Sequence, residues 1–153
     1  MPQIDSTGTI ARVDDIGASR LSACAELALL QRAHSGFTAP ELLCGVATEL
    51  ALATADVFAF GMVLHHAVFR ARPHAGKTLA ALRQVAAQPP VPATANPRAP
   101  AVSALRLPLA PAPAGYAAHA PLLQLIERCW AAEPSARPTF QQLYGALDDM
   151  EVL

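Results

Sequence analysis

Apolar residues are continuous enough between residues 55 and 69 to predict a central buried helix. Val57, Phe58, Phe60, Met62 and Val68 occupy positions on nearly every side of it, and a helix without a polar face is typical of the interior. Thr54 precedes this run and is the expected N-cap residue. The stretch is broken by Asp56, His65 and His66, so we do not expect it to cross a membrane.

Shorter helices are expected on both sides of this run. A brief helix should start at Pro40, a residue favoured in the first helical position, and an amphipathic helix should span residues 76–87. Further helices are predicted over 120–131 and 139–150. The last begins with Thr139 and Gln142 spaced as a capping box, and it places Phe140, Leu143 and Leu147 on one face.

The first residues favour β structure. Residues 4–13 read as a tight hairpin, because Asp5-Ser6-Thr7-Gly8 is typical of a turn and residues 9–13 alternate between apolar and polar. Residues 17–34 fit either a helix or a loop with one helical turn. The predicted fold class is therefore mainly α, a helical domain entered by a short β hairpin.

Eight of the 14 prolines lie between Pro89 and Pro113. Proline lacks a backbone donor and fixes φ, so we expect this Pro/Ala-rich insert to run as an extended, solvated loop with polyproline character. It contains Pro97-Arg98-Ala99-Pro100, a minimal proline-ligand pattern that any proline-rich linker can also produce.

Composition narrows the function classes. Hydrophobic residues make up 53% of the 153 residues, and the net charge is −1, which disfavours a disordered chain or a nucleic-acid partner. Cys24, Cys44 and Cys129 lack metal-binding or disulfide spacing, so buried free thiols are expected. His65 and His66 are adjacent and face different ways, which favours packing over metal binding. With no signal-peptide pattern, we expect a soluble, cytoplasmic protein.

Four motifs occur in a characteristic order. They are Asp15-Ile16-Gly17, Thr38-Ala39-Pro40-Glu41, Asp56-Val57-Phe58-Ala59-Phe60-Gly61, and Cys129-Trp130 followed by Pro134 and Arg137-Pro138-Thr139-Phe140. Together they resemble the D-F-G, A-P-E, D-V-W-S-F-G and C-W…P…R-P-T-F motifs of protein kinase domains, above all the tyrosine-kinase and tyrosine-kinase-like groups. The resemblance covers the C-terminal lobe, over residues 1–153, with an activation segment at about 15–41.

The resemblance implies roles for single residues. Asp15 corresponds to the Mg²⁺ ligand beside ATP, with Gly17 permitting the chain reversal that follows it; the other interpretation of Asp15 is an ordinary turn residue. Glu41 and Arg137 correspond to a buried ion pair. Asp56 corresponds to a residue that holds the catalytic loop, while Trp130 is expected to be a core aromatic.

The activation segment also contains hydroxyl groups. The resemblance makes Ser19, Ser22, Ser35 and Thr38 candidate phosphorylation sites, although most such hydroxyls in kinases are merely solvated. Ala33-His34 departs from the serine/threonine-kinase pattern, while Phe37-Thr38 resembles the tyrosine-kinase one. The hydroxyl specificity of the parent enzyme is therefore open.

Several kinase parts are absent from this sequence. It contains no Gly-rich phosphate loop, no V-A-I-K strand, no H-R-D catalytic loop and no Asn for a second Mg²⁺. Phosphoryl transfer depends on those parts acting together. We therefore expect Mg²⁺ and ATP to bind the full-length parent and not this chain alone. The start at Met1 inside the expected hairpin suggests a truncated gene product, a gene-model error or a fragment.

Three functions stay open. The first is a fragment of a protein kinase whose ATP site lies upstream. The second is a non-catalytic interaction module that docks proteins through its helical lobe, and the third is a decayed relic. Retention of Asp15 favours the first. In every case we expect a missing N-lobe, a protein substrate or a docking protein to cover exposed apolar surface.

Overall fold

The first unit of the chain contains a two-stranded sheet. The computed structural model describes residues 3–4, 11–12, 35–45, 49–94, 100–109 and 120–150, and the chain divides into compact units at residues 1–34 and 35–153. Strand β1 (Gln3–Ile4) pairs antiparallel with β2 (Ala11–Arg12), so that Gln3 lies opposite Arg12 and Ile4 opposite Ala11. The predicted pairing of these two segments is thus confirmed, while its turn lies outside the described residues.

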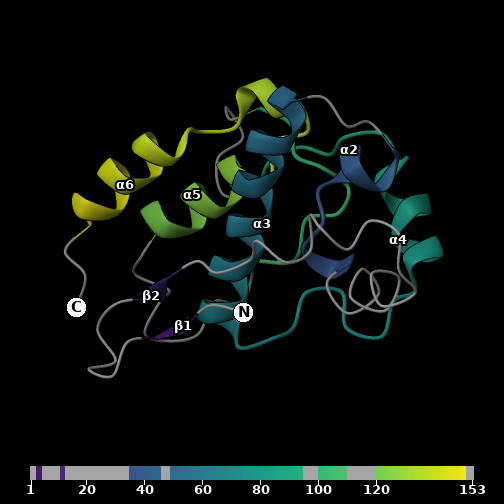
Figure 1. The fold of residues 1–153 in the computed structure, drawn as a ribbon, viewed down its shortest axis with the longest axis horizontal. Helices are drawn as coiled ribbons and strands as arrows, with labels where there is room; N and C mark the ends of the chain where they lie inside the picture. Colours follow the sequence, from purple (N-terminus) through teal and green to yellow (C-terminus); the bar gives the residue numbers. More distant parts are fainter. Residues whose placement is uncertain are drawn as a thin grey trace. The chain divides into compact units, whose positions relative to one another are not determined.

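The second unit is helical, as Figure 1 shows. The mainly α class predicted from the sequence is therefore confirmed for the described residues. In chain order the elements are the 3₁₀ turn η2 (Ser35–Phe37), α2 (Pro40–Leu43), α3 (Glu49–Phe69), α4 (Leu79–Ala86), α5 (Ala120–Cys129), the 3₁₀ turn η3 (Pro134–Ala136) and α6 (Phe140–Asp148).

Helix α3 is the central element of this unit, and α2, α5, η2 and η3 pack against it. It begins at Glu49 instead of Ala55, so the prediction of Thr54 as an N-cap is wrong. The residues from Glu49 to Ala53 are Glu, Leu and Ala, all strong helix formers, and one Thr inside a helix costs only a few tenths of a kcal/mol, about 0.5. The helix therefore continues through Thr54.

One side of α3 is buried and another is exposed. Val57, Phe58 and Met62 are almost inaccessible, whereas Val63 is 50% exposed. A helix that is apolar all round was expected to be covered all round. The second unit, as described, therefore leaves part of an apolar helix in contact with solvent.

Threonine hydroxyls cap the N-termini of α4 and α6. Thr78 Oγ1 accepts a hydrogen bond from the Ala81 amide at 3.2 Å at the start of α4. At α6 the predicted capping box is confirmed: Thr139 Oγ1 accepts from the Gln142 amide at 3.2 Å, and Gln142 Oε1 accepts from the Thr139 amide at 2.8 Å. On the predicted apolar face of α6, Leu143 is buried while Phe140 is 51% exposed.

The Pro/Ala-rich insert is more buried than predicted. It has no regular helix or strand within its described residues, as expected, but Ala93, Val102, Leu105 and Leu109 belong to the hydrophobic core. The prediction of a solvated loop is therefore wrong for these residues.

The physical reason lies in the backbone hydrogen bonds of the insert. The Val91 and Val102 amides each bond the other residue's carbonyl, at 2.9 and 2.8 Å, and the Ser103 amide bonds the Trp130 carbonyl at 2.8 Å. Satisfied backbone groups can be buried at little cost, so the apolar side chains between the prolines can pack inward.

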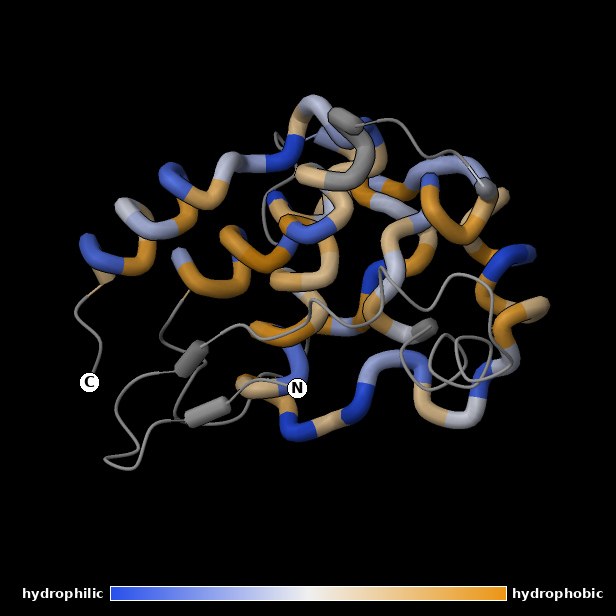
Figure 2. The backbone as a smooth tube through the Cα atoms, viewed as in Figure 1, coloured by the Kyte–Doolittle hydropathy of each residue, from blue (hydrophilic) through white to orange (hydrophobic). Residues whose placement is uncertain are grey.

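The core lies between α3, α5 and this insert, and hydrophobic segments of the backbone converge there in Figure 2. Trp130, Phe58 and Met62 are its largest fully buried side chains. Among the cysteines, Cys129 is buried as predicted, but Cys44 is exposed and Cys24 lies outside the described residues. Both described cysteines are free thiols.

Candidate functional site: the meeting point of three motifs

Arg137 joins four parts of the second unit. Its Nη1 and Nη2 donate to the two carboxylate oxygens of Glu41 at 2.6 and 2.9 Å, across a sequence separation of 96 residues. Nη1 also donates to the Thr54 carbonyl at 2.9 Å, and Nε donates to the Ala131 carbonyl at 3.0 Å. The structure therefore contains the Glu41–Arg137 ion pair that the resemblance implied.

Burial makes this arrangement, which we call the arginine joint, energetically important. The Arg137 side chain is fully buried and that of Glu41 is 10% exposed. The guanidinium also lies over the Phe58 ring, 5.2 Å from its centroid, a favourable cation–π distance. A buried charge is tolerated only when it is paired and hydrogen-bonded, and this one has a bidentate partner, two carbonyls and an aromatic face.

Gly61 allows the central helix to approach the Cys129-Trp130 motif closely. A Cβ atom at position 61 would lie 2.6 Å from Cys129 Cβ and 2.8 Å from Trp130 Nε1, closer than side chains can pack. Trp130 is fully buried, as predicted for a core aromatic. The motif from Asp56 to Gly61 therefore contacts the motif that begins at Cys129.

Three of the four motifs thus meet in the described structure. The Pro40-Glu41 motif is bound to Arg137 by the ion pair, and the Asp56–Gly61 motif contributes Phe58 beneath the guanidinium and Gly61 beneath Trp130. The residues that make these contacts are those by which the motifs were identified. The fourth motif, with Asp15 and Gly17, lies outside the described residues, as do Ser19 and Ser22.

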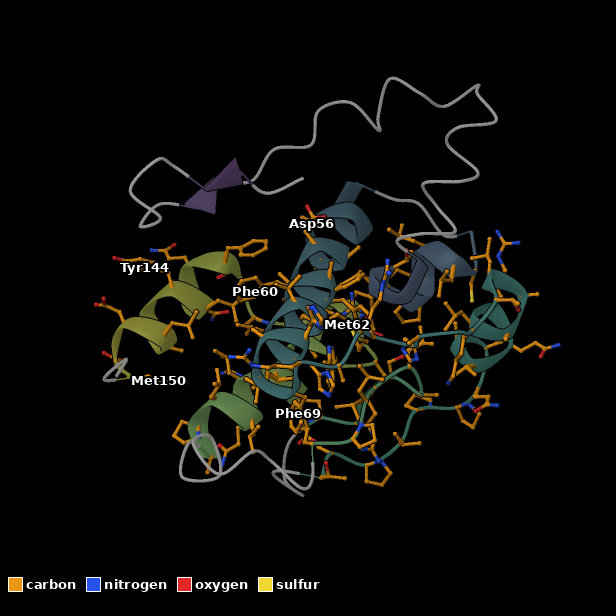
Figure 3. The ribbon with its side chains drawn as sticks, turned by 90° about the horizontal axis from the view of Figure 1, so that it is seen from below. Asp56, Phe60, Met62, Phe69, Tyr144 and Met150 are labelled. Atoms are coloured by element: carbon orange, nitrogen blue, oxygen red, sulfur yellow. The ribbon has the colours of Figure 1, made fainter. Side chains whose placement is uncertain are left out.

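Asp56 is exposed near one end of α3, as Figure 3 shows. Its carboxylate makes no hydrogen bond or ion pair with the part of the chain that the structure describes. The role implied for it, binding a catalytic loop, requires residues that this sequence does not contain. Of the candidate phosphorylation sites, Thr38 is half-buried and Ser35 lies in η2.

Two histidines bind the insert to the helices. His65 Nε2 donates to the Pro108 carbonyl at 3.1 Å, and His74 Nε2 donates to the Leu105 carbonyl at 2.9 Å. We call these two contacts the histidine anchors. His65 is buried and stacks on Phe69, with ring centroids 4.4 Å apart, so the prediction that it serves packing is confirmed, while His66 is exposed.

The electrostatics of the histidine anchors favour neutral rings. Burial lowers the pKa of His65, with a further small lowering from His66 that opposes the effect of its hydrogen bond. The pKa of His74 is also lowered, first by burial and then by the nearby Lys77 ammonium. In both rings Nδ1 is buried without a hydrogen-bond partner, so protonation there would leave a charge without an acceptor.

Burial also controls the Cys129 thiol, because it raises its pKa to about 12. A thiol held neutral is a poor nucleophile and a poor metal ligand. No three His, Cys, Asp or Glu side chains within the described ranges are placed to hold a metal ion. The contacts around Arg137 and Trp130 hold α2, α3 and the segment after α5 together.

Sequence reasoning missed the histidine anchors and one further buried contact. Glu127 of α5 is 2% exposed and accepts hydrogen bonds from the amide and hydroxyl of Thr94, the amide at 2.7 Å. These partners are 31 to 43 residues apart in sequence, and no local pattern marks them. The sequence did contain one signal for the Glu127 contact, because Glu127 is a charged residue in the apolar face of a predicted helix.

No family model matches the chain, and no curated protein matches it either. Among the described helices, none combines the length and apolar character that a membrane crossing requires. The features of this chain that point to a function are therefore its motifs and the contacts between them.

Proposed function

We propose that the chain is the helical C-terminal lobe of a protein kinase domain, and that its full-length parent transfers phosphate from ATP to serine, threonine or tyrosine in proteins. The observation that carries the proposal is the convergence of three motifs. Sequence motifs that match by chance have no reason to contact one another, yet Glu41, Phe58 and Arg137 form one buried cluster.

In this proposal the described residues position the active site and take no part in the chemistry. The arginine joint fixes the end of the activation segment at Glu41 to the central helix and to the segment before α6. Asp15 would hold Mg²⁺ against the phosphates of ATP, which supplies the charge stabilisation that phosphoryl transfer needs. Gly17 would provide the conformational freedom beside it.

The isolated chain should not catalyse phosphoryl transfer. It carries neither a Gly-rich loop, nor a Lys-bearing strand, nor an H-R-D loop, and one carboxylate cannot replace their combined positioning. We therefore expect no phosphate transfer from labelled ATP to a general protein substrate in the presence of Mg²⁺. Measurable transfer that disappears in Asp15→Asn but persists in Asp14→Asn would contradict this expectation.

The kinase assignment is tested by the codons that precede Met1 in the native transcript. Sequencing the native transcript should reveal in-frame codons for a Lys-bearing strand and an H-R-D…N loop. The protein made from that longer reading frame should then lose activity on Asp15→Asn and keep it on Asp14→Asn. A stop codon immediately upstream would contradict a catalytic parent.

A specific observation favours a second candidate, a non-catalytic interaction module. Val63, Phe140 and Tyr144 are exposed by 50, 51 and 73%, and the Phe140 ring packs edge-on to Phe60 with centroids 5.8 Å apart. Exposed aromatic clusters are typical of protein contacts. A monodisperse monomer that retains no partner on size-exclusion chromatography would count against this function.

A further inference from the structure

The charges of this chain are distributed very unevenly. No Asp or Glu occurs between Asp56 and Glu127, whereas six basic residues do, namely Arg70, Arg72, Lys77, Arg83, Arg98 and Arg106. The net charge of −1 is therefore the sum of two opposite parts. The segment between Asp56 and Glu127 is strongly positive, and the rest of the chain is negative. A local excess of one sign matters for recognition more than the total does.

Four of these basic residues lie close together in the chain, between the end of α3 and the middle of α4, and all four are exposed. Arg70, Arg72 and Lys77 are exposed in the connection between α3 and α4, and Arg83 is exposed on α4 itself. Figure 2 shows this connection as largely hydrophilic, and Figure 1 shows that it leads directly from the end of α3 to α4. We call these four residues the basic edge.

The connection is held in a fixed backbone conformation. Pro73 is buried, and a Cβ atom at Gly36 would lie 2.5 Å from the Pro73 carbonyl oxygen, so η2 packs directly against it. The Lys77 amide bonds the His74 carbonyl at 3.0 Å, and the Arg70 amide bonds the His66 carbonyl at 2.8 Å. The His74 ring in turn binds the insert.

Two residues of this connection have a positive φ, a backbone conformation that residues other than glycine rarely adopt. Arg70 has φ of 51° and His74 has φ of 50°, in the left-handed region that costs a non-glycine residue about 1 kcal/mol. Such strain persists only where the surroundings enforce it. The basic side chains of the connection are therefore presented by a rigid frame, which lowers the entropy lost when a partner binds.

The helices packed beside α4 supply little negative charge to Arg70 and Lys77. Helix α4 packs against α2 and η2, in which Glu41 is the only acidic residue. The arginine joint already binds the Glu41 carboxylate. Within the described ranges neither Arg70 nor Lys77 forms a salt bridge.

We propose that the basic edge docks an acidic segment of a partner polypeptide. A polypeptide fits better than a single-stranded nucleic acid, because residues 70–83 contain no Phe, Tyr or Trp side chain on which a base could stack. This surface is distinct from the arginine joint, and its binding does not require phosphoryl transfer.

The test uses the whole chain and a fluorescent peptide of about ten glutamates, with a Gly-Ser peptide of equal length as the neutral control. Binding is measured by fluorescence anisotropy in about 0.1 and about 1 M salt, between which the Debye length falls from about 10 Å to about 3 Å. We expect saturable binding of the acidic peptide in the lower salt, its loss in the higher salt, and no binding of the neutral peptide.

The double variant Arg70→Gln/Lys77→Gln should weaken this binding about three- to tenfold, since exposed ion pairs are worth about 0.2–1 kcal/mol each. Arg128→Gln removes an exposed charge elsewhere, at the end of α5, and should leave the affinity unchanged. Circular dichroism checks that each variant is folded, and Arg83→Gln serves as a second probe if the double variant is not.

Three results would overturn the proposal. The first is no binding of the acidic peptide in the lower salt. The second is an equal loss of affinity in Arg128→Gln and in the basic-edge variants. The third is tighter binding of a single-stranded oligonucleotide or an anionic lipid vesicle than of the peptide, which would identify a different class of partner.

Discussion

The arginine joint and the histidine anchors both attach segments that are distant in sequence to the helices of the second unit. They do so with different chemistry. In the joint a permanent cation has its carboxylate, carbonyl and aromatic contacts in place. In the anchors each neutral ring donates once and leaves Nδ1 buried without a partner.

The difference shows what burial demands of each group. A guanidinium stays charged at every accessible pH. A fold that buries one must therefore provide its charge and hydrogen-bond partners, or the free energy of unfolding falls by several kcal/mol. An imidazole can stay neutral, so one hydrogen bond suffices near neutral pH. The joint is therefore strong, whereas the anchors are weaker and should respond to acid.

The largest expected effect comes from breaking the joint. Arg137→Ala leaves Glu41 buried without its cation and should lower the free energy of unfolding by about 3–5 kcal/mol. Arg128→Ala, which removes an exposed arginine of α5, should change it by less than about 0.5 kcal/mol. Urea unfolding followed by circular dichroism measures both, and equal midpoints for the two variants would show that the joint contributes no stability.

A second change tests the contact between α3 and Trp130 and leaves both charges of the arginine joint in place. Gly61→Ala places a methyl group 2.6 Å from Cys129 Cβ, so α3 must shift and carry His65 with it. We expect a loss of about 1–3 kcal/mol from overpacking.

Gly145→Ala is the matched control for this substitution, because nothing lies within 4 Å of its Cβ position in α6. It should be stabilising by up to about 1 kcal/mol, the helix propensity of alanine over glycine. Thermal unfolding of the two variants should therefore give shifts of opposite sign. A Gly61→Ala variant as stable as the parent would contradict the close approach of the two motifs.

The smallest effect near neutral pH is the titration of the histidine anchors. Both pKa values are lowered from 6.5 in the folded chain, so below about pH 6.5 the unfolded chain binds more protons than the folded chain. Stability should therefore fall as the pH falls from 6.5 through the lowered values. Urea midpoints measured between about pH 7.5 and 5 should show this decline.

Matched variants assign that decline to the anchors. His74→Asn removes one anchor and keeps a residue type tolerant of positive φ, so the pH dependence should become shallower. His66→Gln alters an exposed histidine on the same helix and should leave the dependence nearly as it is. An undiminished slope in His74→Asn would show that the decline has another origin.

Local chemistry made several features predictable from sequence. The capping box of Thr139 and Gln142, the proline start of α2 at Pro40 and the pairing of β1 with β2 follow from the preferences of a few neighbouring residues. The resemblance to kinase motifs added the Glu41–Arg137 pair, which no local pattern contains. Thr54 misled the prediction because a cap preference can be overridden by the helix formers before it.

The insert from Pro89 to Pro113 shows where the sequence is insufficient. Its proline content correctly predicts an irregular backbone over the part of the insert that the structure describes. Whether Val102 and Leu105 face solvent or core depends on partners for the backbone, and these come from Trp130, His74 and their neighbours. Likewise, nothing near position 83 in the sequence indicates that Arg83 donates to the Leu43 carbonyl, at 3.1 Å.

The sequence by itself determined the helical class, the capping box of α6 and the excess of positive charge between Asp56 and Glu127, because these depend on residues within a few positions of one another or on composition. Only the tertiary structure decided which polar groups are buried together and which basic residues are exposed. Those contacts join atoms up to 96 residues apart, and their free energy depends on burial, which exists only once the chain has folded.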